Sequence, residues 1–189
     1  MYKMCKTEQS AARQRQLEEG LLKVMLTKHF EEVSVSELCD QLQVPRKSFY
    51  RYFSSKDGAL HALIDHTLLE YEGYFPDQNK EMERSSHMDL ERFFRYWKDK
   101  HLLLDALDRS GLGGVLVLRA VDHAMSDLGI PVRFLPQNAR HVRKHATMFG
   151  VCGLMSMVMN WHKAGYDLST SDMADIAVQL LTKPIFSER

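Results

Sequence analysis

The densest set of side chains able to bind nucleic acid lies between Gln41 and Lys56. This stretch holds four basic residues and no acidic one, and two tyrosines and two phenylalanines stand among the charges. Cationic side chains bind phosphate oxygens and the acceptor edges of bases. The composition therefore indicates a nucleic-acid-binding surface. A solvated basic face on a small helical hairpin is the alternative, which charge alone does not exclude.

Two short helices joined by a tight turn are predicted around these charges. Ser34 followed by Glu37 is a capping box, so a helix should begin at Val35. Pro45 cannot continue a helix but suits the first turn of a new one, so a basic helix is expected over residues 46–53. A short helix, a turn and a basic helix form the helix-turn-helix pattern, whose second helix enters the DNA major groove.

The segment from Val44 to Lys56, VPRKSFYRYFSSK, resembles the recognition segment of TetR-type bacterial transcriptional regulators. Residues 21–30 also resemble the first helix and following turn of that family. The resemblance implies an all-α fold with a helix-turn-helix DNA-binding domain, expected over residues 1–72. A C-terminal helical bundle for regulation and dimerisation is expected over residues 73–189. The resemblance of this C-terminal part to the family is weaker, and it points to the branch of TetR-type regulators that contains dihydroxyacetone-kinase activators.

Three residues depart from the family pattern. Gln43 replaces the usual turn glycine, so the turn is expected to hold a left-handed residue under strain. Pro45 replaces the usual serine or threonine cap, so the second helix loses a side-chain acceptor. Lys47 stands where a small residue is common, which predicts a long cation close to the DNA and a distinct operator.

The predicted DNA contacts divide into base edges and phosphates. Base contacts are expected from the first residues of the second helix, which are Arg46, Lys47 and Ser48. The resemblance implies phosphate contacts by Tyr50, Tyr52 and Lys56. The predicted DNA-binding set is completed by Ser34 and Arg51. Phe49 and Phe53 are expected in the core.

The uneven charge of the chain supports this assignment although its net charge is zero. Residues 1–56 have a balance of +3, residues 57–91 of −7 and residues 92–189 of +4. Local charge, not the total, sets the affinity for phosphates. Residues 1–10 are expected to form a loose tail, in which Lys3 and Lys6, with Arg13 and Arg15 beyond it, could touch DNA; a solvated, disordered tail is the alternative. His29 is expected to end the first long helix in a left-handed conformation.

The C-terminal part reads as a helical bundle able to hold a ligand and a second subunit. Residues 147–161 are apolar nearly all round, so the helix that carries them must be covered on several sides. The predicted dimer-interface residues are Gly150, Gly153, Met157, Ile176 and Leu180; an ordinary core helix in a monomer is the alternative. The predicted pocket residues are Phe93, Trp97, Leu104, Val117, Met155 and Trp161; plain core packing is the alternative.

Other classes of protein are disfavoured. No apolar run is long enough to span a bilayer, and the N-terminal residues lack a signal-peptide core. Cys5, Cys39 and Cys152 are far apart, which favours the reducing cytoplasm over a disulfide framework. His141 and His145 have metal-ligand spacing on a helix, but basic neighbours oppose a cation. We expect no metal, no cofactor and no membrane partner.

The sequence thus predicts a TetR-type regulator that acts as a repressor. It is expected to bind a palindromic operator in double-stranded DNA as a homodimer, under control of a small-molecule effector. One rival is a helical coactivator or protein-interaction module that keeps the fold without reading DNA. The other is a small-molecule-modifying enzyme in the C-terminal bundle, which is disfavoured because no nucleophile–base pair is visible.

Overall fold

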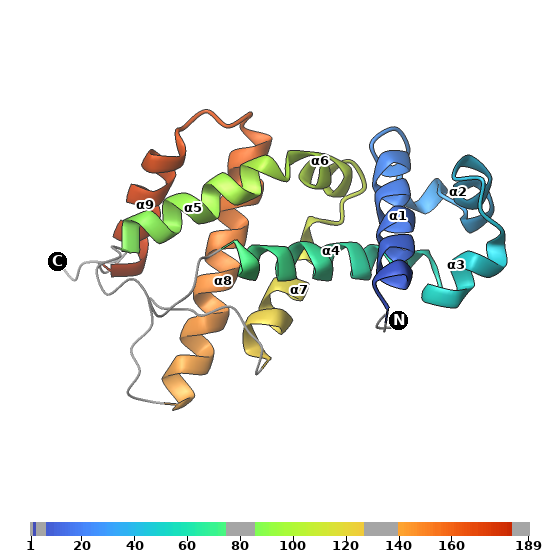
Figure 1. The fold of residues 1–189 in the computed structure, drawn as a ribbon. Helices are drawn as coiled ribbons and strands as arrows, with labels where there is room; N and C mark the ends of the chain where they lie inside the picture. The colour runs from blue at the N-terminus through green and yellow to red at the C-terminus, as the bar shows by residue number, and fades with distance from the viewer. Residues whose placement is uncertain (1, 3–6, 75–85, 127–139, 183–189) are drawn as a thin grey trace. The chain divides into compact units, whose positions relative to one another are not determined.

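The computed structural model describes residue 2 and residues 7–74, 86–126 and 140–182, and within these residues the chain forms helices joined by turns and short irregular segments (Figure 1). The expected all-α fold is confirmed, and an isolated bridge between Tyr2 and Phe53 is the one β-type pairing in the described part. The helices are α1 (Glu8–Met25), η1 (a 3-10 turn, Phe30–Glu32), α2 (Val35–Gln41), α3 (Arg46–Tyr52), α4 (Lys56–Gly73), α5 (Ser86–Asp99), α6 (His101–Arg109), α7 (Gly113–Met125), α8 (Arg140–Lys163) and α9 (Thr170–Thr182).

The chain groups into two compact units. Unit 1 combines residues 1–70 with residues 102–119, and unit 2 combines residues 71–101 with residues 120–189. Two helices, α4 and α7, therefore begin in unit 1 and end in unit 2. The domain boundary expected from the sequence, between residues 72 and 73, stays a prediction. In space, residues 102–119 group with the helix-turn-helix segment.

The two helix starts of the helix-turn-helix differ as their sequences predict. Ser34 caps α2 by accepting a hydrogen bond from the Glu37 backbone N–H at 3.1 Å. Pro45 precedes α3 and, as a proline, has no side-chain acceptor to supply such a bond. Gln43 has a φ of 53°, so the left-handed residue expected in the turn is confirmed. A residue that has a Cβ adopts this conformation only at a cost in free energy, so the turn is strained.

Unit 1 closes around large apolar side chains. Phe49 and Phe53 are 0% and 1% exposed, as expected, and their rings lie 5.1 Å apart. Gly20 of α1 allows a close approach, since a Cβ built there would lie 2.4 Å from a Leu42 methyl carbon at the end of α2. The absence of a side chain at residue 20 thus lets α2 pack directly on α1.

Two expectations about the N-terminal part are wrong. His29 is extended, with a φ of −62° and a ψ of 139°, because α1 has already ended: the Lys28 N–H bonds to the Val24 carbonyl oxygen, and the chain leaves the helix without a left-handed residue. The N-terminal tail is not wholly loose, because Tyr2 is bound to unit 1 through both backbone and side chain. Lys3 and Lys6 lie outside the described residues.

Unit 2 has an aromatic interior. Helix α5 packs against α9, with His87 Nε2 lying 3.2 Å from Asp175 Oδ1. Trp97 and Trp161 are 1% and 2% exposed. Helix α8 ends before Gly165, whose φ of 71° confirms the expected C-terminal cap.

Candidate nucleic-acid interface

Helix α3 has one buried face and one charged, solvent-exposed face. Phe49 and Tyr52, three residues apart, point into the core of unit 1. The opposite face of α3 is exposed and carries Arg46, Lys47, Tyr50 and Arg51. Ser48 is half-buried. The structure therefore brings the predicted base-reading residues and two of the other predicted contacts onto one surface.

The remaining predicted contacts are placed differently. Ser34 is exposed at the start of α2, where its hydroxyl is occupied as the helix cap. Tyr52 is only 7% exposed, and its ring packs beside Phe53 and under the Arg51 guanidinium. Their roles on DNA stay predictions, but capping and core packing already account for both side chains.

Lys56 makes contacts within the protein that the sequence did not indicate. Its Nζ donates to the carbonyl oxygens of Phe30 at 2.7 Å and of Glu31 at 2.9 Å. The same ammonium lies 4.7 Å from the centre of the Phe30 ring. Two of its three donors are thus used to hold η1 against the start of α4, which leaves one for a phosphate.

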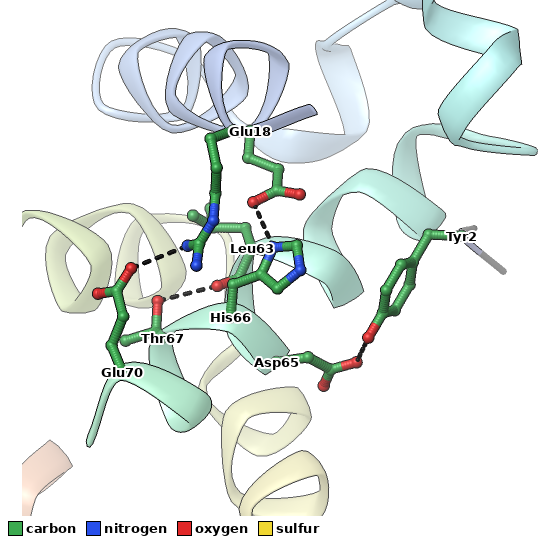
Figure 2. A network of polar contacts seen from close by, with 8 residues as sticks. Tyr2, Glu18, Leu63, Asp65, His66, Thr67 and Glu70 are labelled. Atoms are coloured by element: carbon green, nitrogen blue, oxygen red, sulfur yellow. Dashed lines mark hydrogen bonds and ion pairs between the residues drawn. The ribbon is translucent and has the colours of Figure 1, made fainter. Parts of the chain in front are cut away.

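A polar network behind the helix-turn-helix was also not predicted (Figure 2). The Tyr2 hydroxyl donates to Asp65 Oδ2 at 2.7 Å, and Arg119 of α7 donates to both oxygens of the same carboxylate, from Nε at 2.7 Å. Next to them, His66 Nδ1 lies 2.8 Å from Glu18 Oε2 of α1, and Figure 2 shows the two side chains facing each other. No local sequence pattern signals these pairs, because their members are 48 to 63 residues apart.

Basic residues at the edge of α1 are used in local pairs. Arg15 Nη1 bonds to Glu70 Oε1 of α4 at 2.8 Å, and Arg13 Nη1 bonds to Gln16 Oε1 at 2.6 Å. Both arginines were considered as DNA contacts. In the structure, Arg15 joins α1 to α4.

The predicted effector pocket divides between the units. Phe93, Trp97, Met155 and Trp161 are buried in unit 2, whereas Leu104 and Val117 belong to unit 1. Only the first four are therefore brought into one compact unit, and the pocket stays a prediction.

The predicted dimer-interface residues lie on α8 and α9. Ile176 and Leu180 are 38% and 42% exposed, and a Cβ added at Gly150 or Gly153 would meet nothing within 4 Å. Met157 is half-buried. Phe149, which the prediction did not include, is the most exposed aromatic of α8 at 66%. Gly153, Ile176 and Leu180 are thus exposed, whereas Gly150 is buried, and the interface stays a prediction.

Searches for other kinds of site gave nothing within the described ranges. No three histidine, cysteine, aspartate or glutamate side chains there are grouped so that they could hold a metal ion. Among the helices that the structure describes, none has both the length and the apolar character to cross a membrane.

Comparison with known proteins agrees with this geometry. Residues 19–63, which contain the C-terminal part of α1, the helix-turn-helix and the start of α4, match the family described as bacterial regulatory proteins, tetR family. No curated protein matches the chain by sequence.

Three solved structures illustrate the similarity of the fold. The dihydroxyacetone kinase operon activator DhaS is 12% identical, with a TM-score of 0.56 over 90% of this chain and 94% of that one. The fatty acid degradation regulator FadR from Bacillus halodurans is 14% identical, with a TM-score of 0.58 over 96% and 98%. The transcriptional regulator FadR from Bacillus subtilis, in complex with stearoyl-CoA, is 13% identical, with a TM-score of 0.57 over 91% and 99%. These identities establish likeness of fold alone. The helix-turn-helix segment thus matches the bacterial regulatory proteins of the tetR family, and the all-helical fold of the chain is similar to that of solved regulators.

Proposed function

We propose that this protein represses transcription by binding a palindromic operator as a homodimer, with α3 of each subunit in a major groove. The observation that carries the proposal is the exposed face of α3, where Arg46, Lys47, Tyr50 and Arg51 stand together within the segment that matches the family. Arginine is the side chain most suited to bidentate contact with guanine, and lysine and tyrosine can reach phosphates or bases.

The experiment that tests this proposal is selection of bound DNA from a random pool by purified protein at moderate salt. Enrichment of a palindrome supports a dimeric reader, and the spacing of its half-sites tests the two-fold arrangement. A folded protein that enriches no sequence, and that also lacks weak binding to random DNA at low salt, supports the rival function of a protein-interaction module.

The exposed apolar residues of α8 and α9 support the homodimer. Phe149 on α8, and Ile176 and Leu180 one turn apart on α9, expose side chains that a partner would bury. Sedimentation should find a dimer for the native chain and a monomer for the double variant Ile176→Glu/Leu180→Glu. Ser171→Glu, at the exposed start of the same helix, is the matched control and should leave the dimer intact. A native monomer would exclude the proposed assembly.

Unpaired polar atoms inside unit 2 support an effector. Asp89 Oδ1 and Trp97 Nε1 are buried without a hydrogen-bond partner among the described residues. They are eight residues apart on α5, roughly 12 Å along the helix axis, and Phe93 lies between them. A buried polar atom that stays unpaired costs free energy, so a ligand that pairs with one of them would be favoured.

The proposed effector is a molecule with a long apolar body and a hydrogen-bond acceptor for the Trp97 indole. Stearoyl-CoA is the first compound to test, because the similar FadR from Bacillus subtilis holds it. If the effector binds best to a dimer whose two α3 helices no longer match the spacing of the major grooves, it would shift the population of dimers away from DNA. Release of operator DNA by stearoyl-CoA, weakened by Trp97→Phe, would support this class. Trp161→Phe is the comparison variant for Trp97→Phe, because the Trp161 indole is already bonded to the Leu168 carbonyl oxygen.

A further inference from the structure

Tyr2 is attached at once to the end of the recognition helix and to the helix behind it. Its backbone pairs with Phe53 in an antiparallel bridge, and its hydroxyl bonds to Asp65 of α4. We propose that Tyr2 and Arg119, which both donate to the carboxylate of Asp65, form with it a clamp that positions α3 for DNA reading and transmits movement of α7 to it. This proposal of the clamp (Tyr2, Asp65 and Arg119) rests on the proposed function in DNA binding.

The first step of the argument is that α3 is weakly held by its own sequence. It has seven residues, begins after a proline that has no side-chain acceptor, and follows Gln43 in a left-handed conformation. A helix this short is unstable in isolation. Its C-terminal neighbour Phe53 is extended, and the pairing with Tyr2 fixes the backbone at that point. The end of α3 thus depends on an attachment from a distant part of the chain.

The second step is that the attachment has a fixed direction. Burial and the neighbouring Asp65 carboxylate raise the pKa of the Tyr2 hydroxyl above its ordinary value. The hydroxyl therefore keeps its proton at neutral pH and donates it to Asp65. The Tyr2 ring also packs edge-on against His66, with ring centres 5.9 Å apart, and His66 bonds to the buried Glu18 of α1. Tyr2 thus contacts both Asp65 and His66 of α4, and Figure 2 shows its hydroxyl bond to Asp65.

The third step is that α7 controls the acceptor. Arg119 donates from Nε to Oδ1 and from Nη2 to Oδ2, so both oxygens of Asp65 are oriented by one guanidinium. Asp65 is only 8% exposed, and without Arg119 its charge would be buried with the tyrosine as its remaining partner. Helix α7 continues beyond Arg119 into residues that belong to unit 2. A displacement of α7 would therefore weaken the hold of Asp65 on Tyr2 and, through it, on the end of α3.

The test is hydrogen–deuterium exchange of the α3 segment, measured by mass spectrometry on the full chain, together with DNA binding. Tyr2→Phe keeps the ring and the backbone bridge but removes the hydroxyl. We expect exchange over residues 46–53 to rise roughly three- to tenfold, as for loss of one hydrogen bond of ordinary strength, because the backbone bridge remains. Affinity for the selected operator should fall by more than affinity for random DNA. Tyr166→Phe removes a hydroxyl bonded to His162 in unit 2 and is the matched control, with no change expected in α3.

Arg119→Met tests the link to α7. We expect it to raise exchange of α3 by at least as much as Tyr2→Phe, and the double variant should fall short of the product of the two effects, because both act through Asp65. Unchanged exchange over residues 46–53 in folded Tyr2→Phe would overturn the clamp. Independent, multiplicative effects of the two changes would overturn the part assigned to α7. If the native chain selects no DNA sequence, the proposed function fails, whereas the exchange measurements still decide whether the clamp holds α3.

Discussion

Two buried aspartates, one in each unit, have the same exposure and opposite surroundings. Asp65 of unit 1 and Asp89 of unit 2 are both 8% exposed. Both oxygens of Asp65 are bonded, by Arg119 and Tyr2. One oxygen of Asp89 is buried without a partner in the described part of the chain, and the nearby Tyr71 is affected by its charge.

The difference indicates two uses of a buried charge. A paired carboxylate favours the one arrangement in which its donors meet it, which would suit the presentation of α3 to DNA under the proposed function. A carboxylate with one buried oxygen left unpaired disfavours the arrangement that buries it, so a ligand or a movement that supplied a partner would be favoured. Asp65 thus favours the one arrangement in which its donors meet it, whereas Asp89 has an oxygen that the described residues leave unpaired.

The largest effect should follow from breaking the paired site. Arg119→Met leaves Asp65 charged, buried and held by Tyr2 alone, so the free energy of unfolding should fall by about 3 kcal/mol. Chemical denaturation at neutral pH measures it. Arg95→Met, which removes a guanidinium from a surface pair with Glu91, is the control and should cost at most about 0.5 kcal/mol. Equal losses in the two variants would show that the Asp65 pair is no stronger than a surface pair.

The same substitution at the two aspartates should act in opposite directions. Asp65→Asn loses charge-assisted bonds to Arg119 and Tyr2 and should destabilise the protein by roughly 1–3 kcal/mol. Asp89→Asn removes a buried charge and should leave stability unchanged or raise it by up to about 1 kcal/mol. Denaturation midpoints of both variants provide the comparison. A clear loss of stability in Asp89→Asn would mean that the carboxylate has a stabilising partner, and would remove it from the effector site.

The features that sequence predicted are those set by neighbours in the chain. The cap at Ser34, the strained turn at Gln43 and the burial of Phe49 and Phe53 follow from residues within one or two helical turns. The left-handed stop expected at His29 was wrong because a local preference for that conformation does not require it: α1 ended through ordinary backbone bonds before that residue.

The features that sequence missed join residues far apart. Tyr2 and Asp65 are 63 positions apart, Asp65 and Arg119 are 54 apart, and Lys56 bonds to carbonyl oxygens 25 and 26 residues before it. A basic or acidic residue in a sequence shows its charge but not its partner. Lys56 therefore looked free to bind a phosphate, and Asp65 looked like one more acidic residue of the negative segment.

Alkaline pH should weaken the two units through one tyrosine in each. Burial is the main cause that raises the pKa of both Tyr2 and Tyr71, which remain protonated in the folded state above pH 10 while the unfolded chain loses these protons. The stabilisation from each is complete below the ordinary pKa of tyrosine and decreases as pH rises above it, by at most about 1.4 kcal/mol per pH unit. Tyr2 is partly exposed, so its share should be smaller than that of the more buried Tyr71. The free energy of unfolding, measured by denaturation between pH 9 and pH 11, roughly the range around the free tyrosine pKa, should fall less steeply with pH in Tyr71→Phe than in Tyr2→Phe. The reverse order would contradict the burial argument.

Two lysines of the candidate nucleic-acid interface also differ in whether they have partners within the protein. Lys47 is exposed on α3, whereas Lys56 donates to two backbone carbonyl oxygens. If Lys47 meets a phosphate, Lys47→Ala should reduce the slope of log K against log salt by about one unit, with little change in protein stability. Lys56→Ala should also reduce the slope if the predicted phosphate contact forms, but its internal bonds predict a lower free energy of unfolding in addition. A reduced slope at unchanged stability in Lys56→Ala would mean that the ammonium leaves Phe30 and Glu31 to bind DNA, and that the two lysines act alike once the operator is bound.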